Sequence, residues 1–177
     1  MQAKVLYSAE EFLAIPSAED RLFELDEGEL IEMTKPGIRH RIIAGKIIRR
    51  LVDAVSDSGL GAVMGGEVAF VLANGTVRTP DIAVLLGERA VKQPGALVGP
   101  PDIAIEVLSP TDLANHVARK RKQFLDAGTK EVWIFEPEIA MVDVYRADGS
   151  GRGFESPTVL TTPLIANLSL SLAEIFG

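Results

Sequence analysis

Apolar and polar residues alternate near the start of the chain and then change to a longer period. Residues 21–33 alternate around a turn at residues 26–28, which predicts two antiparallel strands joined by a tight turn. From residue 38 onward the apolar residues recur with the 3.6-residue period of a helix that lies on a core. They are Ile38, Ile42, Ile43, Ile47, Leu51, Val52 and Val55. This part of the chain is therefore predicted to form a hairpin followed by a long amphipathic helix.

The flanking segments predict a short helix and three strands. Ser8 followed by two glutamates matches the start of a short helix, which Pro16 would end. Residues 66–72 and 76–86 are predicted to be two strands joined by an Asn-Gly turn. The branched apolar run at residues 102–109 is typical of a central strand.

The second half of the chain predicts another long helix and more strands. This helix is expected to begin after Thr111 and to stop at Gly128. Residues 131–137 and 141–148 predict two strands, and the tail from Gly149 predicts one further strand and a short terminal helix. The order of elements indicates an α/β fold of the mixed α+β kind, with a mixed β-sheet flanked by helices. A chain of 177 residues, 47% of them hydrophobic, is predicted to form a single domain over residues 1–177.

The composition excludes cysteine-based chemistry and indicates the cellular compartment. The chain has no cysteine, which excludes disulfides, thiolate zinc sites and thiol nucleophiles and fits a reducing cytoplasm. The N-terminus has no signal-peptide pattern and no apolar run approaches a membrane span of about 20 residues, so we expect a cytoplasmic protein without a membrane partner. A net charge of -7 argues against coating nucleic acid by bulk electrostatics. Basic residues cluster at 39–50 and 119–122, however, and a local field can outweigh the total.

One carboxylate lies inside an apolar run. Glu106 is flanked by Ile103, Ala104 and Ile105 on one side and Val107 on the other. A charge there is costly unless it is paired or bound to a metal ion. The structural alternatives are a buried ion pair or an edge strand that leaves the carboxylate in solvent.

A second acid opens an earlier apolar run. Asp81 follows Pro80 and precedes four apolar residues, where an aspartate often only caps a turn. In the sequence, Glu106 lies one strand-loop-strand unit after Asp81. The two carboxylates could therefore meet on neighbouring strands and share an oxygen-loving cation.

A lysine falls on the apolar face of the second long helix. At about 100° per residue, five residues share one narrow face. They are Leu113, Val117, Lys120, Phe124 and Ala127. Lys120 is thus expected to point towards the sheet, while Arg119 and Lys122 project into solvent or towards phosphates. For an isolated lysine, the alternative is a buried stem with a solvated amine.

Two acids and a lysine form a chemically coherent set. The carboxylates can hold Mg²⁺, which polarises a phosphate oxygen and lowers the pKa of a bound water. The ammonium can stabilise the negative charge that develops as water attacks phosphorus.

These residues, in order, resemble the motifs of the restriction-endonuclease-like family of the PD-(D/E)XK nuclease superfamily, a bacterial group long catalogued as a domain of unknown function. The resemblance covers roughly residues 20–146. Its motifs are Phe23-Glu24-Leu25, Gly28-Glu29-Leu30, His40, Pro80-Asp81, residues 105–110, Lys120 with Phe124 and Gly128, and residues 132–137. The chain departs from the family pattern at Phe124, where tyrosine is typical, and at Glu136, where aspartate is usual.

The resemblance implies a restriction-endonuclease-like core and Mg²⁺-dependent cleavage of DNA, with Mn²⁺ able to substitute. By position it makes Asp81 and Glu106 the metal ligands. The superfamily's commonest lysine position is occupied here by Leu108, and Lys120 matches the family's alternative placement on the following helix. His40 is a further candidate, as a base, a substrate contact or a surface residue. Glu67 is another, in the metal shell or facing solvent.

Other functions lack their motifs. There is no Gly-rich phosphate loop between strand and helix, no HExxH zinc site and no serine-hydrolase elbow. The remaining alternative is a catalytically inactive nuclease fold that binds nucleic acid or protein. A homodimer is expected if two cuts are made at a symmetric site.

Overall fold

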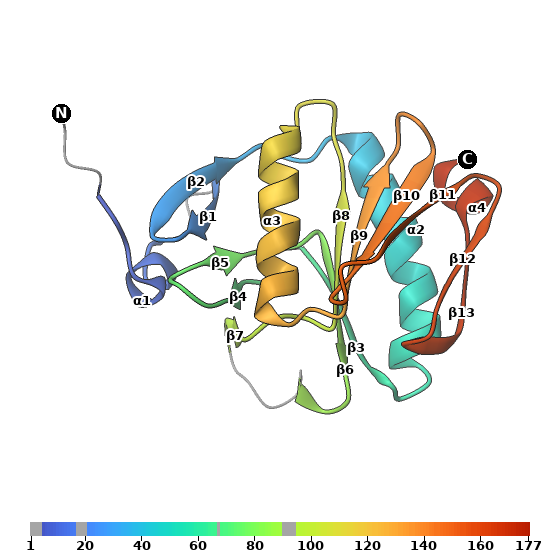
Figure 1. Ribbon diagram of the computed structural model, residues 1–177, viewed down its shortest axis with the longest axis horizontal. Coiled ribbons are helices and arrows are strands. Elements are labelled where there is room, and N and C mark those ends of the chain that lie inside the picture. Colours follow the sequence, from blue (N-terminus) through green and yellow to red (C-terminus); the bar gives the residue numbers. More distant parts are fainter. Residues whose placement is uncertain (1–4, 17–20, 67, 90–94) are drawn as a thin grey trace.

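A six-stranded mixed sheet forms the centre of the fold (Figure 1). The structure is a computed structural model that describes residues 5–16, 21–66, 68–89 and 95–177. The strand order is β11-β10-β9-β8-β6-β3, and all neighbours are antiparallel except the parallel pair β8 and β9. The strands are β3 (Gly61–Gly65), β6 (Ile82–Leu86), β8 (Ile103–Val107), β9 (Glu131–Glu136), β10 (Met141–Arg146) and β11 (Gly151–Glu155). The predicted mixed sheet is confirmed.

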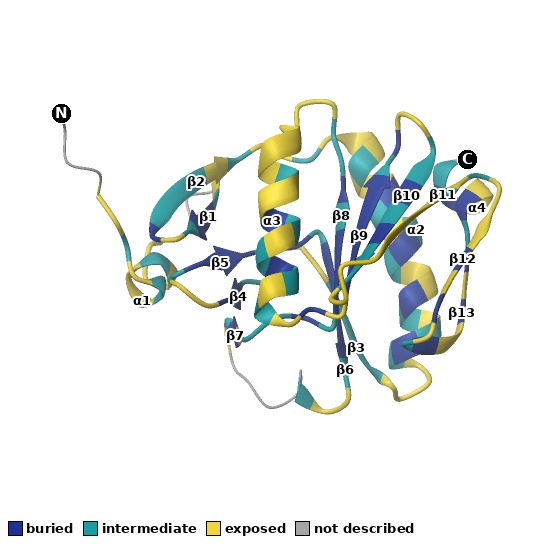
Figure 2. Ribbon diagram, viewed as in Figure 1, coloured by how far each residue is buried: buried dark blue, intermediate teal, exposed yellow. Residues whose placement is uncertain are grey.

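Helices and a hairpin cover the two faces of this sheet (Figures 1 and 2). On one face lie α2 (Ile38–Leu51) with its π-helical extension η1 (Val52–Ser56), the hairpin β12 (Val159–Thr162) and β13 (Ile165–Ser171), and α4 (Leu172–Phe176). On the other face lies α3 (Ala114–Ala127). Among the described residues, no helix is long and apolar enough to cross a membrane.

The alternation of side chains along β8 sends neighbours to opposite faces. Ile103, Ile105 and Val107 pack in the core beneath α2, while Ala104 packs in the second core beneath α3 with Phe124. Glu106 has the same parity as Ala104. The carboxylate is therefore directed to the face that α3 covers.

A second, five-stranded sheet lies beside α3 in the order β2-β1-β5-β4-β7 (Figure 1). Its strands are β1 (Leu22–Asp26), β2 (Glu29–Met33), β4 (Phe70–Val71), β5 (Val77–Arg78) and β7 (Leu97–Val98). The predicted hairpins are both present, since β1 pairs with β2 and β4 with β5. The predicted short helix is α1 (Ala9–Leu13), which begins with a capping box between Ser8 and Glu11.

The predicted strand over residues 76–86 is wrong, because it forms two strands in different sheets. β5 and β6 are separated by Thr79, Pro80 and Asp81. Pro80 has no N–H to donate to a ladder and therefore favours a break at this point. The break turns the chain from the small sheet into the large one, and Asp81 lies at that change of direction.

The predicted start of the second long helix is also wrong. Thr111 does not cap α3, because the N-cap is Leu113, which has no side-chain cap. The Asp112 carboxylate instead accepts hydrogen bonds from the N–H and the hydroxyl of Ser109. These bonds form a turn over residues 109–112, and the helix begins only after this turn. Leu113, predicted on the buried face, is 58% exposed for the same reason.

Two strand predictions were incomplete. Residues 61–65, for which no strand was predicted, form the edge strand β3. The tail forms three strands, β11 to β13, where one was predicted. β11 contains two glycines and little alternation, so its pairing with β10 gives no clear period in the sequence.

Candidate active site

Asp81 and Glu106 meet on adjacent strands. Ile82 is paired with Ile105 in the antiparallel ladder of β6 and β8, so the residue before Ile82 lies opposite Glu106. Asp81 Oδ2 accepts a hydrogen bond from the Val107 N–H at 2.7 Å, which ties the Asp81 side chain to β8 beside Glu106. The structure thus brings the two predicted acids together.

Lys120 reaches the same place from α3. Its ammonium Nζ lies 2.8 Å from Glu106 Oε1 and 3.0 Å from Oε2, and it donates to the Thr79 carbonyl oxygen at 2.9 Å. The side chain is buried beside Phe124 beneath the helix, as the helical period predicted. Arg119 and Lys122 project on the exposed side. The three sequence-predicted residues therefore share one site.

Burial changes the ionisation of the two central groups. Desolvation raises the pKa of Glu106 to about 8; the Lys120 charge opposes this rise, and the charges of Asp81 and Glu24 add to it. Desolvation lowers the pKa of Lys120, but the negative charges of Glu106, Glu24 and Asp81 outweigh it and raise that pKa above its usual value. The lysine stays an ammonium.

The carboxylates fit a hard cation that uses few protein ligands. Glu106 Oε1 is buried and accepts no well-aligned hydrogen bond, although it lies close to the ammonium. Within the described ranges, no group of three or more His, Cys, Asp or Glu side chains is arranged around a common metal position. Mg²⁺ often uses one or two carboxylates and completes its shell with water and substrate phosphates. Asp81 and Glu106 match that requirement.

His40 is part of the site and not a surface residue. It lies in the first turn of α2, and its Nε2 is 3.0 Å from Asp81 Oδ2. A carboxylate oxygen only accepts, so Nε2–H donates to it. The opposite nitrogen, Nδ1, is buried without a hydrogen-bond partner. The histidine therefore helps orient Asp81. Glu67, the other further candidate from the sequence, lies outside the residues that the structure describes.

Sequence reasoning missed Glu24 as a site residue. It lies on β1, is buried, and its Oε1 is 2.9 Å from Lys120 Nζ. The strand period places Glu24 on the polar side of the hairpin, which would normally face solvent. Only its place within the Phe23-Glu24-Leu25 motif pointed to it.

The basic clusters are largely matched by internal partners. Arg119 pairs with Asp26 and Glu27, and Lys122 pairs with Asp126. In the first cluster, Arg39 pairs with Glu138, Arg50 pairs with Glu174, and Lys46 donates to three carbonyls at the end of the chain. The local positive field expected from the sequence is therefore reduced.

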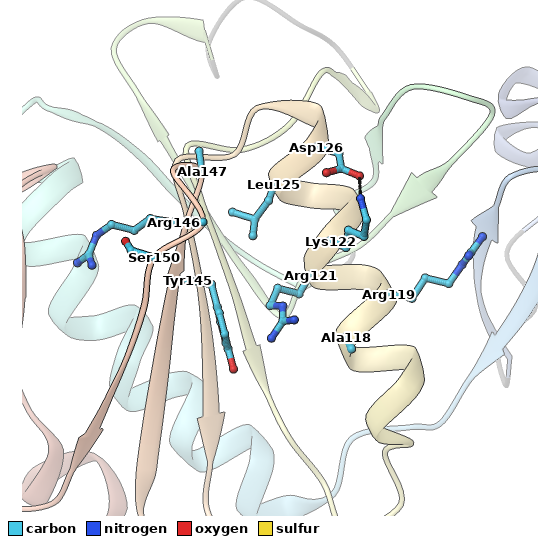
Figure 3. Close-up of a pocket in the computed structure, with 11 residues that line it drawn as sticks. Ala118, Arg119, Arg121, Lys122, Leu125, Asp126, Tyr145, Arg146, Ala147 and Ser150 are labelled. Atoms are coloured by element: carbon cyan, nitrogen blue, oxygen red, sulfur yellow. Dashed lines mark hydrogen bonds and ion pairs between the residues drawn. The ribbon is translucent and has the colours of Figure 1, made fainter.

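A separate groove of about 630 Å³ lies between α3 and the turn that joins β10 to β11 (Figure 3). The Arg121 guanidinium lies 3.9 Å above the Tyr145 ring inside it. Arg119 and Arg146 also line the groove, and their side chains extend in opposite directions (Figure 3). Asp81, Glu106 and Lys120 are not among its lining residues, so this groove is distinct from the candidate active site.

Comparisons with known proteins agree with this fold. A model of the Uma2 family, described as "Putative restriction endonuclease", matches residues 9–175. A crystal structure from Anabaena variabilis, described as a "putative nuclease belonging to DUF820", superposes with a TM-score of 0.85 at 25% sequence identity. The match covers 96% of this chain and 97% of that chain. No curated protein matches the chain.

Proposed function

The chain belongs to the Uma2 family, described as putative restriction endonucleases, and on that premise we propose that it hydrolyses phosphodiester bonds in DNA with a divalent metal ion. Asp81 and Glu106 are the proposed ligands of Mg²⁺, which Mn²⁺ can replace. Lys120 is the proposed catalytic cation. The observation that supports this most directly is the Lys120 ammonium 2.8 Å from Glu106, with Asp81 fixed on the adjacent strand.

Each residue of the proposed site has a separate role. When bound, the metal ion supplies Lewis acidity and a water of lowered pKa. Lys120 stabilises negative charge on the phosphate oxygens and orients the attacking water as the bond from phosphorus to the leaving oxygen breaks. His40 keeps Asp81 in position through its Nε2–H. A cut in both strands at a symmetric site requires two such sites, so we propose that the active form is a homodimer.

A second candidate is an inactive nuclease fold that only binds nucleic acid or protein. Its protein-binding form is favoured by the net charge of -7 and by the internal pairing of Arg119, Lys122 and Arg39, which leave few cations for DNA. The two candidates differ in whether a bound divalent ion supports cleavage.

Nicking of supercoiled plasmid by the purified protein in Mg²⁺ or Mn²⁺, combined with calorimetry, tests the proposal. We expect EDTA to abolish nicking and added Mg²⁺ to restore it. Asp81→Asn should lose Mn²⁺ binding, whereas Lys120→Ala should keep it and lose cleavage by about 10²- to 10³-fold. Lys122→Ala, two residues away on the exposed face, is the matched control and should cleave normally.

Absence of Mn²⁺ binding at high protein concentration, or normal cleavage by Lys120→Ala, would contradict the nuclease proposal. Retention of DNA without cleavage in either metal would favour the binding module.

A further inference from the structure

Glu24 is a third buried carboxylate at the proposed active site, with 2% of its surface exposed. Both of its oxygens contact donors within the protein. Oε2 accepts from Arg78 Nη1 at 2.9 Å. Oε1 accepts from the Thr79 N–H at 2.9 Å and lies 2.9 Å from Lys120 Nζ. A carboxylate occupied in this way has no free oxygen for a metal ion, so its role differs from that of Asp81 and Glu106.

Glu24 joins two parts of the site that are far apart in the sequence. Thr79 lies two residues before Asp81, and its carbonyl oxygen accepts from Lys120 Nζ at 2.9 Å. Glu24 Oε1 contacts both the Thr79 N–H and the same ammonium. Glu24, Thr79 and Lys120 thus each contact the other two, and these contacts fix the backbone that leads to Asp81 relative to the Lys120 ammonium.

The charges around Lys120 also distinguish Glu24 from Glu106. The ammonium lies within 2.9 Å of an oxygen of each acid. A cation that engages Glu106 weakens the hold of that carboxylate on the lysine, since the same negative charge is then shared. Glu24, which also pairs with Arg78, keeps an anionic partner beside Lys120 in that state.

Resting on the proposed nuclease function, we infer that Glu24 is a positioning residue that holds Lys120 Nζ and the backbone before Asp81 at their working separation. It contacts neither substrate nor metal and acts through Lys120 and through the Thr79 backbone that leads to Asp81. The role requires both a negative charge and the length of a glutamate side chain. The β1–β2 hairpin is thereby part of the catalytic framework.

Glu24→Gln and Glu24→Asp test this inference against a matched control. Glu131 is equally buried, at 2% exposure, and pairs with Arg146 and Trp133 away from the site. In plasmid nicking, Glu24→Gln should lower kcat by about 10²-fold, because small displacements of a catalytic group have effects of that size. KM for DNA and the Kd for Mn²⁺ should stay within about threefold of wild type, since Glu24 touches neither.

Glu24→Asp keeps the charge but shortens the reach, so its kcat should fall between those of Glu24→Gln and wild type. Glu131→Gln should keep the wild-type kcat. Adding Glu24→Gln to Lys120→Ala should cause a smaller further loss than Glu24→Gln causes in the wild type, because both changes remove the contact between Glu24 and Lys120. A wild-type kcat in Glu24→Gln, an additive loss in the double variant, or an equal loss in Glu131→Gln would overturn the inference.

A measurement that needs no cleavage separates this inference from the proposed function. Acetic anhydride labelling with mass spectrometry reports how well each lysine amine is held. We expect labelling of Lys120 to rise several-fold in Glu24→Gln relative to Lys46, whose amine is held by three carbonyls elsewhere. If the wild type cleaves no DNA, the proposed function fails while this labelling still decides the role of Glu24. Unchanged labelling overturns the inference. If Glu24→Gln does not fold, the same labelling is measured in Glu24→Asp.

Discussion

Asp26 shows how single residues attach the hairpin to the helix that carries Lys120. Its carboxylate accepts from Arg119 Nε at 2.6 Å and from Gln123 Nε2 at 2.7 Å, both on α3, and it pairs with Arg78 at 2.9 Å. Burial alone would raise the pKa of Asp26, but the hydrogen bonds from Arg119 and Gln123 and the charge of Arg78 outweigh it and lower that pKa to about 2. The ionised form is thus favoured by folding.

This lowered pKa predicts how stability depends on pH. A carboxylate with a folded pKa of about 2 and an unfolded pKa of 3.8 adds stability above pH 3.8 and loses it as the pH falls towards 2. We expect Asp26→Asn to be less stable than wild type by about 2 kcal/mol at pH 6. The difference should shrink between pH 4 and pH 2. Urea denaturation of both proteins across this range measures it, and a difference that is constant with pH would contradict the assignment.

The residues that could be predicted are those whose own neighbours in the sequence reveal them. Glu106 stands out inside an apolar strand, and the helical period alone directs Lys120 towards the sheet. Glu24 could not be identified in this way. A strand period says which side chains share a face, but what covers that face depends on α3 packing on the hairpin from some 90 residues away in the chain.

At the scale of elements, the boundaries depended on turns that local pattern does not reveal. The long helices, the hairpins and the central strand β8 were predicted, because each has a clear period or turn. The break at Pro80 was missed because apolar residues continue beyond it. Edge strand β3 was missed because its first residue, Gly61, lies only a few residues after the helical segment ends at Ser56 and resembles a helix termination. Tertiary pairing, and not propensity, makes these segments extended.

Two glycines on neighbouring elements predict opposite effects of the same substitution. A Cβ built on Gly61 would lie 2.0 Å from the Leu85 carbonyl oxygen of the paired strand β6, so Gly61→Ala must displace backbone. We expect it to lower the free energy of unfolding by about 1 to 3 kcal/mol. Gly45 lies on the exposed side of α2 with no atom within 4 Å of such a Cβ, and Gly45→Ala should stabilise by about 0.5 to 1 kcal/mol. Equal effects in thermal denaturation would contradict this close approach of β3 and β6.

At the scale of the whole molecule, the fold class followed from the order of elements, while the arrangement of the sheets did not. Strand β8 pairs with β6 across a long loop and with β9 across α3. Many such pairings satisfy the same period, and burial on both faces selects among them. The distribution of charge was equally hidden, because the sequence shows clusters of basic residues but not the acids that meet them in the fold.

This distribution predicts weak, weakly salt-dependent binding of DNA. The cations near the active site and the groove are mostly paired, and among the described residues Arg121, which stacks on Tyr145, has no carboxylate partner. Each phosphate contact contributes about -0.9 to the slope of log K against log salt concentration, so a slope of about -2 is expected for a short duplex in EDTA.

Arg121→Ala should make that slope shallower by about 0.9. Lys130→Ala, which only removes a pair with Asp102, should leave it unchanged. Fluorescence anisotropy from low to high salt measures the slope, and a value steeper than about -5 would mean that DNA contacts a basic surface other than this groove.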